Sequence, residues 1–287
     1  MQAKLRMVDA IIEVHDARVP LTGRNAYFEQ NLLADTSKPH ILVFNKSDLI
    51  DKKYRQPVEN EMKSKDKKVH SIMWTDFKHK PMVAAADLID IVKDSVTNMQ
   101  RYNRDYRTEY NAMVIGIPNV GKSSLINAVR NRVLGKKGKA TRVGDRPGVT
   151  MAVLNRITVH ENPKIFLIDT PGILAPKAEN IENAMKLALC QTVLETTLSE
   201  SLIADYLLYY LNKRQLFEYV TEFQLKSPTD DIYELLFHIA KSRRLINKSD
   251  KDCKPNFSAA ANFFIACFRS GRLKSDRFMD FDLLNKS

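Results

Sequence analysis

The sequence predicts an α/β fold with a parallel-type central sheet, followed by a smaller all-helical domain. First, short runs of branched aliphatic residues alternate with helical patterns in the first part of the chain. Second, after about Pro176 glycine becomes scarce and apolar residues recur at helical spacing. Third, 287 residues with 44% hydrophobic content are enough for two cores. We place the domains at residues 1–178 and 179–287.

Four runs in the first domain are predicted to be strands, and each is followed by polar or glycine-containing turns. Such runs suit strands that are buried on both faces of a parallel sheet. Two helical patterns lie between them, at residues 83–99 and 123–130. The predicted strands cover residues 8–14, 40–44, 113–115 and 165–168.

The second domain shows only helical signals. Pro228, Thr229 and Asp230 form a helix start signal before the apolar positions Ile232, Leu235, Leu236 and Ile239. Ser258 is predicted to cap a last helix that stops at Gly271. Further apolar positions at helical spacing are Leu187, Val193, Leu194, Leu198, Leu202 and Leu207.

The charge of the chain predicts an anionic partner. The formal net charge is +11 and the pI is near 9.4. Nucleic acid is the first candidate, an acidic membrane surface the second and an acidic protein the third. The three cysteines, Cys190, Cys253 and Cys267, are too widely spaced for a CxxC pair or a disulfide framework, which fits a reducing compartment.

The apolar clusters and the N-terminus show whether a membrane-spanning helix or a targeting leader can be predicted. Runs such as 207–211 and 263–268 are far too short to cross a bilayer of roughly 30 Å, so no spanning helix is predicted. The strand predicted at 8–14 leaves only MQAKLRM ahead of it, in which no leader can be read. We therefore expect the sequence to begin inside a longer reading frame.

The strongest motif is a phosphate-binding loop at residues 116–123, which reads GIPNVGKS. It stands where a predicted strand ends and a helix begins, the context that GxxxxGKS requires. Its backbone N–H groups face phosphate oxygens, Lys122 reaches the β and γ phosphates, and the hydroxyl of Ser123 binds Mg²⁺. The predicted nucleotide-binding residues here are Asn119, Val120, Gly121, Lys122, Ser123 and Ser124.

Two downstream elements complete the phosphate side of the site. Asp169 opens the sequence DTPG directly behind a predicted strand, where a carboxylate holds Mg²⁺ and the amide of Gly172 senses the γ phosphate. Between this element and the loop, Thr150 is predicted to coordinate Mg²⁺ from a mobile switch segment. We therefore assign Ser123, Thr150 and Asp169 to the metal, and Lys122, Thr150 and Gly172 to catalysis.

Base specificity is predicted from Asn45, Lys46, Ser47 and Asp48, an NKxD sequence directly after a predicted strand. The carboxylate of Asp48 can accept two hydrogen bonds from guanine, from N1–H and the 2-amino group, which adenine does not offer. A site built around such paired groups strongly rejects the analogue that lacks them. Lys46 is predicted to lay its aliphatic stem along the base.

The order of the motifs is permuted. The base-recognition motif precedes the phosphate loop by 71 residues, from Asn45 to Gly116, instead of following the DTPG element. Circular permutation is tolerated where the original termini lie close together, because the same strands are rebuilt with one new connection. The residues therefore predict a P-loop GTPase domain in circularly permuted order.

These motifs, in this order, resemble the circularly permuted YlqF/RbgA family of ribosome-biogenesis GTPases, and most closely its mitochondrial branch. The segment at 14–20, VHDARVP, is similar to the DAR segment of that family, and the tail FRSGRL at 268–273 to its closing motif. The resemblance implies a GTP-hydrolysing factor that works on the large ribosomal subunit of mitochondria, at the matrix face of the inner membrane.

The family resemblance also implies roles for particular residues. Asn119 matches an asparagine that marks potassium dependence, although a hydrogen bond that braces the loop is an alternative role. Thr75 and Asp76 match a base-cradling loop. Ile173 stands where Ras-like enzymes use glutamine to orient water, and family members carry a catalytic histidine upstream of the first strand. We therefore expect hydrolysis to be slow without the ribosomal subunit.

Two basic clusters are predicted to contact rRNA, although a solvated loop is the alternative for the first. Within residues 130–146, the glycine-containing segment carries seven basic residues against one acid. A rival hypothesis is a nucleotide-gated binding module with little turnover that regulates mitochondrial translation at a membrane or ribosome. The RNA-contacting residues are predicted to be Arg130, Arg132, Lys136, Lys137, Lys139, Arg142, Arg269, Arg272, Lys274 and Arg277.

Overall fold

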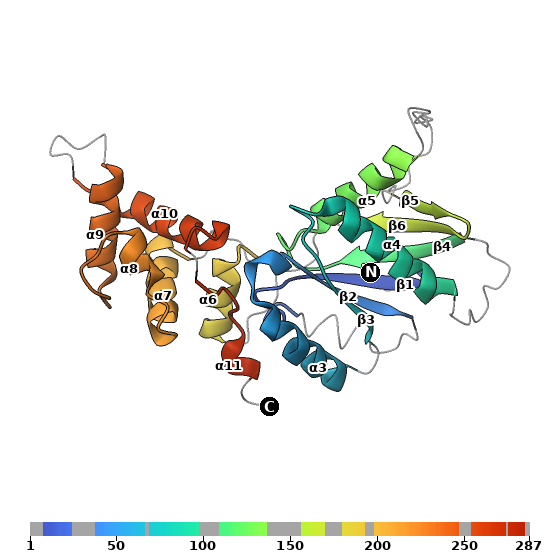
Figure 1. The fold of residues 1–287 in the computed structure, drawn as a ribbon, viewed down its shortest axis with the longest axis horizontal. Helices are drawn as coiled ribbons and strands as arrows, with labels where there is room; N and C mark the ends of the chain where they lie inside the picture. The colour runs from blue at the N-terminus through green and yellow to red at the C-terminus, as the bar shows by residue number, and fades with distance from the viewer. Residues whose placement is uncertain are drawn as a thin grey trace. The chain divides into compact units, whose positions relative to one another are not determined.

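The computed structural model describes residues 8–24, 38–66, 69–97, 109–136, 156–169, 180–192, 198–246, 254–273 and 275–284. The chain divides into two compact units (Figure 1). The first comprises Met1–Lys177 together with Asp280–Ser287, and the second comprises Ala178–Met279. The division at residue 178 predicted from sequence differs from this one at the C-terminus, because the last eight residues belong to the first unit.

The first unit contains a six-stranded sheet in the order β3-β2-β1-β4-β6-β5 (Figure 1). All neighbouring strands run parallel except β5, which pairs antiparallel with β6. This is the mixed α/β fold with a largely parallel sheet that the sequence predicts. The strands are β1 (Ala10–Asp16), β2 (His40–Asn45), β3 (Val69–Trp74), β4 (Glu109–Ile115), β5 (Arg156–Glu161) and β6 (Lys164–Asp169).

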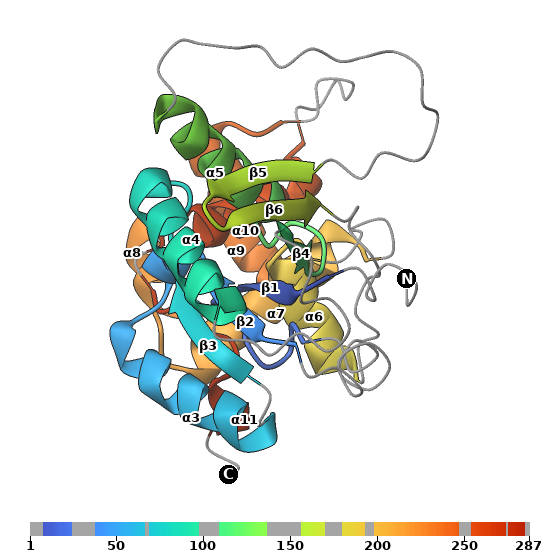
Figure 2. The same ribbon diagram turned by 90° about the vertical axis from the view of Figure 1, so that its right-hand side faces the viewer.

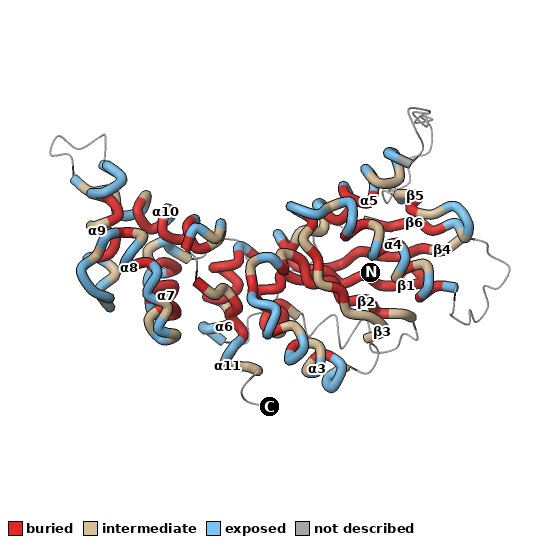
Figure 3. Tube along the Cα trace, in the orientation of Figure 1, coloured by how far each residue is buried: buried red, intermediate tan, exposed pale blue. Residues whose placement is uncertain are grey.

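The two strands that the sequence analysis missed, β3 and β5, are the two edges of the sheet. Every residue of β1 and β2 is buried, whereas most residues of β3 and β5 are half-buried or exposed (Figure 3). An edge strand with one solvated face carries no continuous apolar run. The pattern that identified the central strands was therefore absent at the edges.

Helices cover both faces of this sheet. The path from β2 through α3 (Arg55–Lys65) to β3 runs outward along the sheet, and the path from β3 through α4 (Pro81–Thr97) to β4 runs back. Because such crossovers are right-handed, α3 and α4 lie on opposite faces. Helix α5 (Lys122–Lys136) packs beside α4 (Figure 2). Two 3-10 turns, η2 (Ser47–Leu49) and η3 (Lys52–Tyr54), link β2 to α3.

The C-terminal residues of the chain are fixed to the first unit by a buried carboxylate. Asp280 accepts hydrogen bonds from the backbone amides of Leu21 and Thr22 at 2.7 and 2.9 Å. The short helix α11 (Phe281–Leu284) then packs on α3. This contact explains why the chain returns to the first unit after the helical segment.

The second unit is helical among its described residues, apart from an isolated antiparallel bridge between Ile246 and Pro255. Helix α9 starts at Ile232, directly after the predicted start signal, but its cap is Asp231, which accepts from the amides of Tyr233 and Glu234. The predicted cap at Ser258 is wrong, since Asn256 caps α10 and Ser258 lies inside it. The helices are α6 (Ile181–Leu189), α7 (Glu200–Lys213), α8 (Glu218–Glu222), α9 (Ile232–Arg243) and α10 (Phe257–Ser270).

The core of the helical unit is aromatic and aliphatic. Phe223, Phe264 and Phe268 are fully buried, and the α10 helix ends at Gly271, whose φ of 83° favours glycine. Of the cysteines in the described residues, Cys190 and Cys267 are buried and form no disulfide with each other. Within the described parts of the chain, none of the helices has the length and apolar character needed to span a bilayer.

Candidate guanine-nucleotide site

The predicted nucleotide motifs gather at the carboxyl ends of the parallel strands. The phosphate loop follows β4, the NKxD motif follows β2, and Asp169 ends β6. From β1 the chain builds the sheet outward through β2 and β3, and then returns to add β4 on the other side of β1. Such a reversal of strand order leaves a crevice at the strand ends, which is where ligands bind in open α/β sheets.

The phosphate loop has a backbone that demands its two glycines. Gly116 has φ +146°, and a Cβ there would lie 2.4 Å from the carbonyl oxygen of Val14. Gly121 has φ +107°, and a Cβ there would lie 2.1 Å from Nδ2 of Asn45. Between them Asn119 adopts the left-handed region at φ 59° and is exposed. The loop is therefore fixed in shape by contacts with both β1 and the NKxD motif.

Lys122 and Ser123 stand at the first turn of α5, directly after the loop. The ammonium of Lys122 donates to the carbonyls of Gly116 and Ile117 at 2.9 and 2.6 Å. Burial lowers the pKa of Lys122, and the nearby charge of Asp169 partly offsets that effect. The lysine, the exposed hydroxyls of Ser123 and Ser124, and the Asp169 carboxylate thus lie around one loop. Thr150 and Gly172 lie outside the described residues.

Asn45 joins the base motif to the phosphate loop. Its side-chain Nδ2 donates to the carbonyl of Val120 at 2.9 Å. Its Oδ1 accepts from the amide of Phe77 at 3.2 Å and faces the hydroxyl of Thr75 at 3.5 Å. A buried amide with these partners holds the loops after β2, β3 and β4 together.

Lys46 extends the same connection on the other side of the base motif. Its ammonium donates to Oδ2 of Asp16 and to the carbonyl of Asn119, both at 2.8 Å. The Asp16 side chain is buried at the end of β1 and also pairs with Arg18 at 2.7 Å. The DAR segment therefore contacts the base motif, which in turn contacts the phosphate loop through Lys46.

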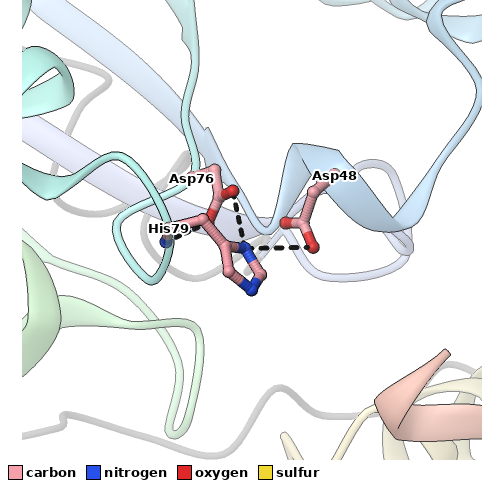
Figure 4. A group of neighbouring side chains, drawn as sticks. All are labelled: Asp48, Asp76 and His79. Atoms are coloured by element: carbon pink, nitrogen blue, oxygen red, sulfur yellow. Dashed lines mark hydrogen bonds and ion pairs between the residues drawn. The ribbon is translucent and has the colours of Figure 1, made fainter.

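Asp48 lies beside Asp76 and His79, and the three side chains point toward one another (Figure 4). Nδ1 of His79 is 2.8 Å from Oδ2 of Asp76 and 3.8 Å from Oδ2 of Asp48. Burial alone would raise the pKa of Asp76, but hydrogen bonds from His79 and the amide of Lys78 lower it. The carboxylate predicted to accept guanine thus has an imidazole next to it, which sequence reasoning missed.

A cavity of about 420 Å³ opens beside this group. Both Asp48 and Asp76 line it, as do Ser47 and Thr75. The amide of Ser47 donates to the carbonyl of Thr75 at 3.0 Å, which joins the NKxD motif to the loop after β3. The structure therefore brings Thr75 and Asp76 next to Asp48, as expected for a loop that cradles a base.

The first predicted RNA-binding cluster is described only in part. Arg130 is exposed on α5, and Arg132 donates to the carbonyl of Met82 at 3.1 Å. Lys136 ends the helix, but its side chain is outside the described set. Lys137, Lys139 and Arg142 also lie outside the described residues. Their contact with RNA stays a prediction.

The second predicted cluster makes contacts within the helical unit. The guanidinium of Arg269 donates to the carbonyls of Leu189 and Ala188 at 2.9 and 2.8 Å, so it caps the end of α6. Arg272 pairs with Glu222 at 2.8 Å, and Arg277 packs against Gly271. Lys274 lies outside the described residues. Arg269 and Arg277 are partly buried by these internal contacts, whereas Arg272 is exposed beside its ion pair. Contact of this cluster with RNA stays a prediction.

Sequence patterns gave little indication of the hydrogen bonds that join these motifs. An acidic residue at the end of a buried strand, as at Asp16, indicates a role at the strand ends, but its partners depend on tertiary structure. The same holds for His79 and for the amide of Phe77. These groups enter the site because parallel strands place their carboxyl ends side by side.

Comparison with known proteins identifies the family of the chain. The family of 50S ribosome-binding GTPases matches residues 111–246, which begin in the phosphate-loop strand, while Asn45–Asp48 lie before the match. Mitochondrial ribosome-associated GTPase 1 of Ictalurus punctatus is 45% identical over 281 residues, covering 95% of this chain and 86% of that protein. Mitochondrial GTPase 1 of Aedes aegypti is 43% identical, covering 94% and 86%.

Bacterial proteins are similar at greater distance. Ribosome biogenesis GTPase A of Bacillus cereus is 32% identical over 240 residues, covering 84% of this chain and 76% of that protein. Among solved structures, YlqF of T. maritima bound to GNP aligns with a TM-score of 0.57 at 20% identity, covering 96% of this chain and 93% of the other. This last likeness concerns the fold.

Proposed function

The chain belongs to the circularly permuted GTPases that include mitochondrial ribosome-associated GTPase 1 and Ribosome biogenesis GTPase A, and from this premise we propose that it acts in assembly of the mitochondrial large ribosomal subunit. As a member of that family it is a GTPase that binds GTP with a divalent metal. In the proposed cycle the GTP-bound form docks on rRNA, and hydrolysis releases it. We place this work in mitochondria, at the matrix side of the inner membrane.

The observation that carries the proposal is the junction of the base motif with the phosphate loop. Asn45 donates to the carbonyl of Val120, and Lys46 donates to the carbonyl of Asn119, so hydrogen bonds join the two halves of the nucleotide site. Guanine recognition is assigned to Asp48, with Thr75 and Asp76 in the adjoining loop. Lys122, Gly121 and the amides of the loop are assigned to the phosphates.

The residues around the phosphate loop fit the proposed metals. The Ser123 hydroxyl and the Asp169 carboxylate are hard oxygen ligands of the kind that Mg²⁺ prefers. The exposed carboxamide of Asn119 is the proposed ligand for K⁺. When bound, these cations neutralise phosphate charge and so assist departure of the γ phosphate. Thr150 and Gly172 are proposed to complete the catalytic set.

The proposed mechanism depends on the partner to accelerate hydrolysis. Lys122 is assigned to the β and γ phosphates, and the charge of Asp169 lies near its ammonium. Ile173 offers no polar group to orient water, unlike the glutamine of Ras-like enzymes. We therefore expect slow turnover by the isolated chain and faster turnover on the ribosomal subunit.

The distribution of charge favours RNA contact by the first unit. The helical unit, Ala178–Met279, carries 14 of the 45 lysines and arginines and 13 of the 34 acidic residues, a net charge of +1 against +11 for the chain. The basic excess therefore lies almost entirely outside that unit. Together with the internal contacts of Arg269, this favours the segment at 130–146 as the main phosphate contact.

Co-sedimentation with large ribosomal subunits across a range of salt concentrations tests this docking. Each phosphate that the protein neutralises contributes roughly −0.7 to −0.9 to the slope of log affinity against log salt. Replacing Lys137, Lys139 and Arg142 with glutamine should flatten the slope by about 2 and weaken docking. The control replaces Lys53, Lys63 and Lys65, which are exposed on or beside α3, and should change neither. Equal behaviour of the two triple variants would contradict docking through this segment.

A further inference from the structure

The carboxylate of Asp16 lies beside the nucleotide motifs, and no role has been assigned to it above. It ends β1, its side chain has no exposed surface, and it lies between the base motif and the phosphate loop. An ionised carboxylate in such a place is costly unless it is fully paired. Its partners therefore show what it does.

Arg18 fixes the Asp16 carboxylate in one orientation. The backbone amide and Nε of Arg18 donate to Oδ1 at 3.1 and 2.9 Å, and Nη2 donates to Oδ2 at 2.7 Å. A fork of this kind adds geometric specificity to charge. Burial alone would raise the pKa of Asp16, but Arg18 and then Lys46 hold it far below its usual range. Asp16 is thus a fixed anion.

The side chain of Lys46 is held at both ends, by its backbone and by the Asp16 carboxylate. Its main chain adopts the left-handed region, with φ 62° and ψ 34°. Its ammonium is held by Asp16 on one side and by the Asn119 carbonyl on the other. With both ends fixed, the four-carbon stem loses most of its rotamer freedom. Such a stem presents a flat apolar edge of constant position.

We infer that Asp16 is a positioning residue that holds Lys46 ready to stack on guanine and ties that lysine to the phosphate loop. The inference rests on the proposed base site at Lys46 and Asp48. It gives the DAR segment a function, since Arg18 orients Asp16 and the amide of Ala17 donates to the carbonyl of Asn45 at 2.8 Å. Asp16 acts through Lys46 and needs no contact with the nucleotide.

The test measures binding of a fluorescent guanosine diphosphate to the whole chain in a double-mutant cycle. Since a hydrogen bond to a charged group is stronger than a neutral one, loss of the anchor should weaken binding by about tenfold or more. We expect that loss for Asp16→Asn and for Lys46→Met separately. The double variant should bind about as weakly as Lys46→Met alone, because Asp16 has no other route to the nucleotide.

Two further variants separate positioning from simple instability. Glu13→Gln removes another buried carboxylate of β1, which pairs with His40 at 2.8 Å, and should lower stability without changing nucleotide affinity. Removal of Asp16 leaves the buried Arg18 without its main partner. The variant Asp16→Asn/Arg18→Met removes both charges and carries the test if Asp16→Asn does not fold.

The outcomes distinguish this inference from the proposed base site. If Lys46→Met binds the nucleotide like the unmodified chain, the assignment of Lys46 to the base is wrong. If Lys46→Met is weakened but the folded Asp16 variant binds normally, the base site stands and the positioning role is overturned. A double variant weakened by the product of the two single effects would also overturn it, because the residues would then act independently.

Discussion

Nδ2 of Asn45 donates to the carbonyl oxygen of Val120 at 2.9 Å, across 75 residues of sequence. In the permuted order, Asn45 comes before the phosphate loop, but this bond restores the contact between the two halves of the nucleotide site. Because Gly121 follows Val120 and lies against the same side chain, the loop and the asparagine must fit together. A side chain at position 121 would therefore disturb both the loop and the base motif.

Gly121→Ala should weaken guanine-nucleotide binding by at least about tenfold. The new Cβ would lie 2.1 Å from Nδ2 of Asn45, at a φ of +107° that costs a residue with a side chain about 1–3 kcal/mol. Gly135→Ala is the matched control, since a Cβ there meets nothing within 4 Å and the position lies in α5. It should leave binding unchanged and raise helix stability slightly. Nucleotide titration compares the two variants, and similar affinities would contradict the fitted loop.

Asp48→Asn should weaken GDP binding by roughly 100-fold or more and shift preference toward xanthine nucleotides. The change replaces an acceptor of two hydrogen bonds with a mixed donor and acceptor, which suits the additional base oxygen of xanthine. Competition binding with GDP, xanthosine diphosphate and ATP measures this. Asp90→Asn, at an exposed position of α4, is the control. Equal competition by ATP in the unmodified chain would end the claim of guanine specificity.

Replacing sodium with potassium should raise GTP turnover, and Asn119→Ala should abolish that increase. The Asn119 carboxamide is exposed within the phosphate loop, where a bound K⁺ would place positive charge near the phosphates. Turnover is measured at matched ionic strength in the two salts, with Mg²⁺ present. If the asparagine only braces the loop, the two salts will give identical rates in the unmodified chain.

The buried pair of Glu13 and His40 should make stability depend on pH in two directions. Burial opposes both charges, but His15 and His40 hold the pKa of Glu13 well below 4.5, and Asp66 and Glu13 raise the pKa of His40 above 6.5. The contribution of Glu13 to the free energy of unfolding is present above pH 4.5 and is lost as pH falls through the lowered pKa of Glu13. The His40 contribution is full below pH 6.5 and is lost as pH rises through its raised pKa.

Both contributions are therefore largest together between about pH 4.5 and 6.5. Thermal unfolding of the unmodified chain and of His40→Gln across pH 4 to 9 checks this. In the unmodified chain the stability should decline as pH rises on the alkaline side, and His40→Gln should lack that decline. His70→Gln, at an exposed position of β3, is the control and should follow the unmodified chain. A pH profile of His40→Gln parallel to the unmodified chain would contradict the pairing.

The sequence predicted the central strands and the nucleotide motifs because each has a local signature. Buried runs such as those of β1 and β2 need continuous apolar residues, and the loop at 116–123 needs its glycines for backbone geometry. The edge strands β3 and β5 were missed because one solvated face breaks that pattern. The cap at Asn256 was missed because Ser258 offers an equally good capping side chain two residues later.

Contacts between distant segments could not be predicted. Asp16 and Lys46 are separated by 30 residues, and no local pattern indicates that they bond. Arg269 lies in a basic cluster of the sequence that predicts RNA contact, and in the structure its guanidinium caps α6. In both cases the partner is a group that only the folded chain brings near.

The central claim is that the large ribosomal subunit accelerates GTP hydrolysis by this protein. Steady-state release of phosphate from GTP should be measured for the whole chain alone, with purified mitochondrial large subunits and with small subunits as a control. We predict slow turnover alone, because Ile173 cannot orient water, and at least about tenfold faster turnover with large subunits only. Turnover that is already fast in isolation, or that large subunits leave unchanged, would contradict the account.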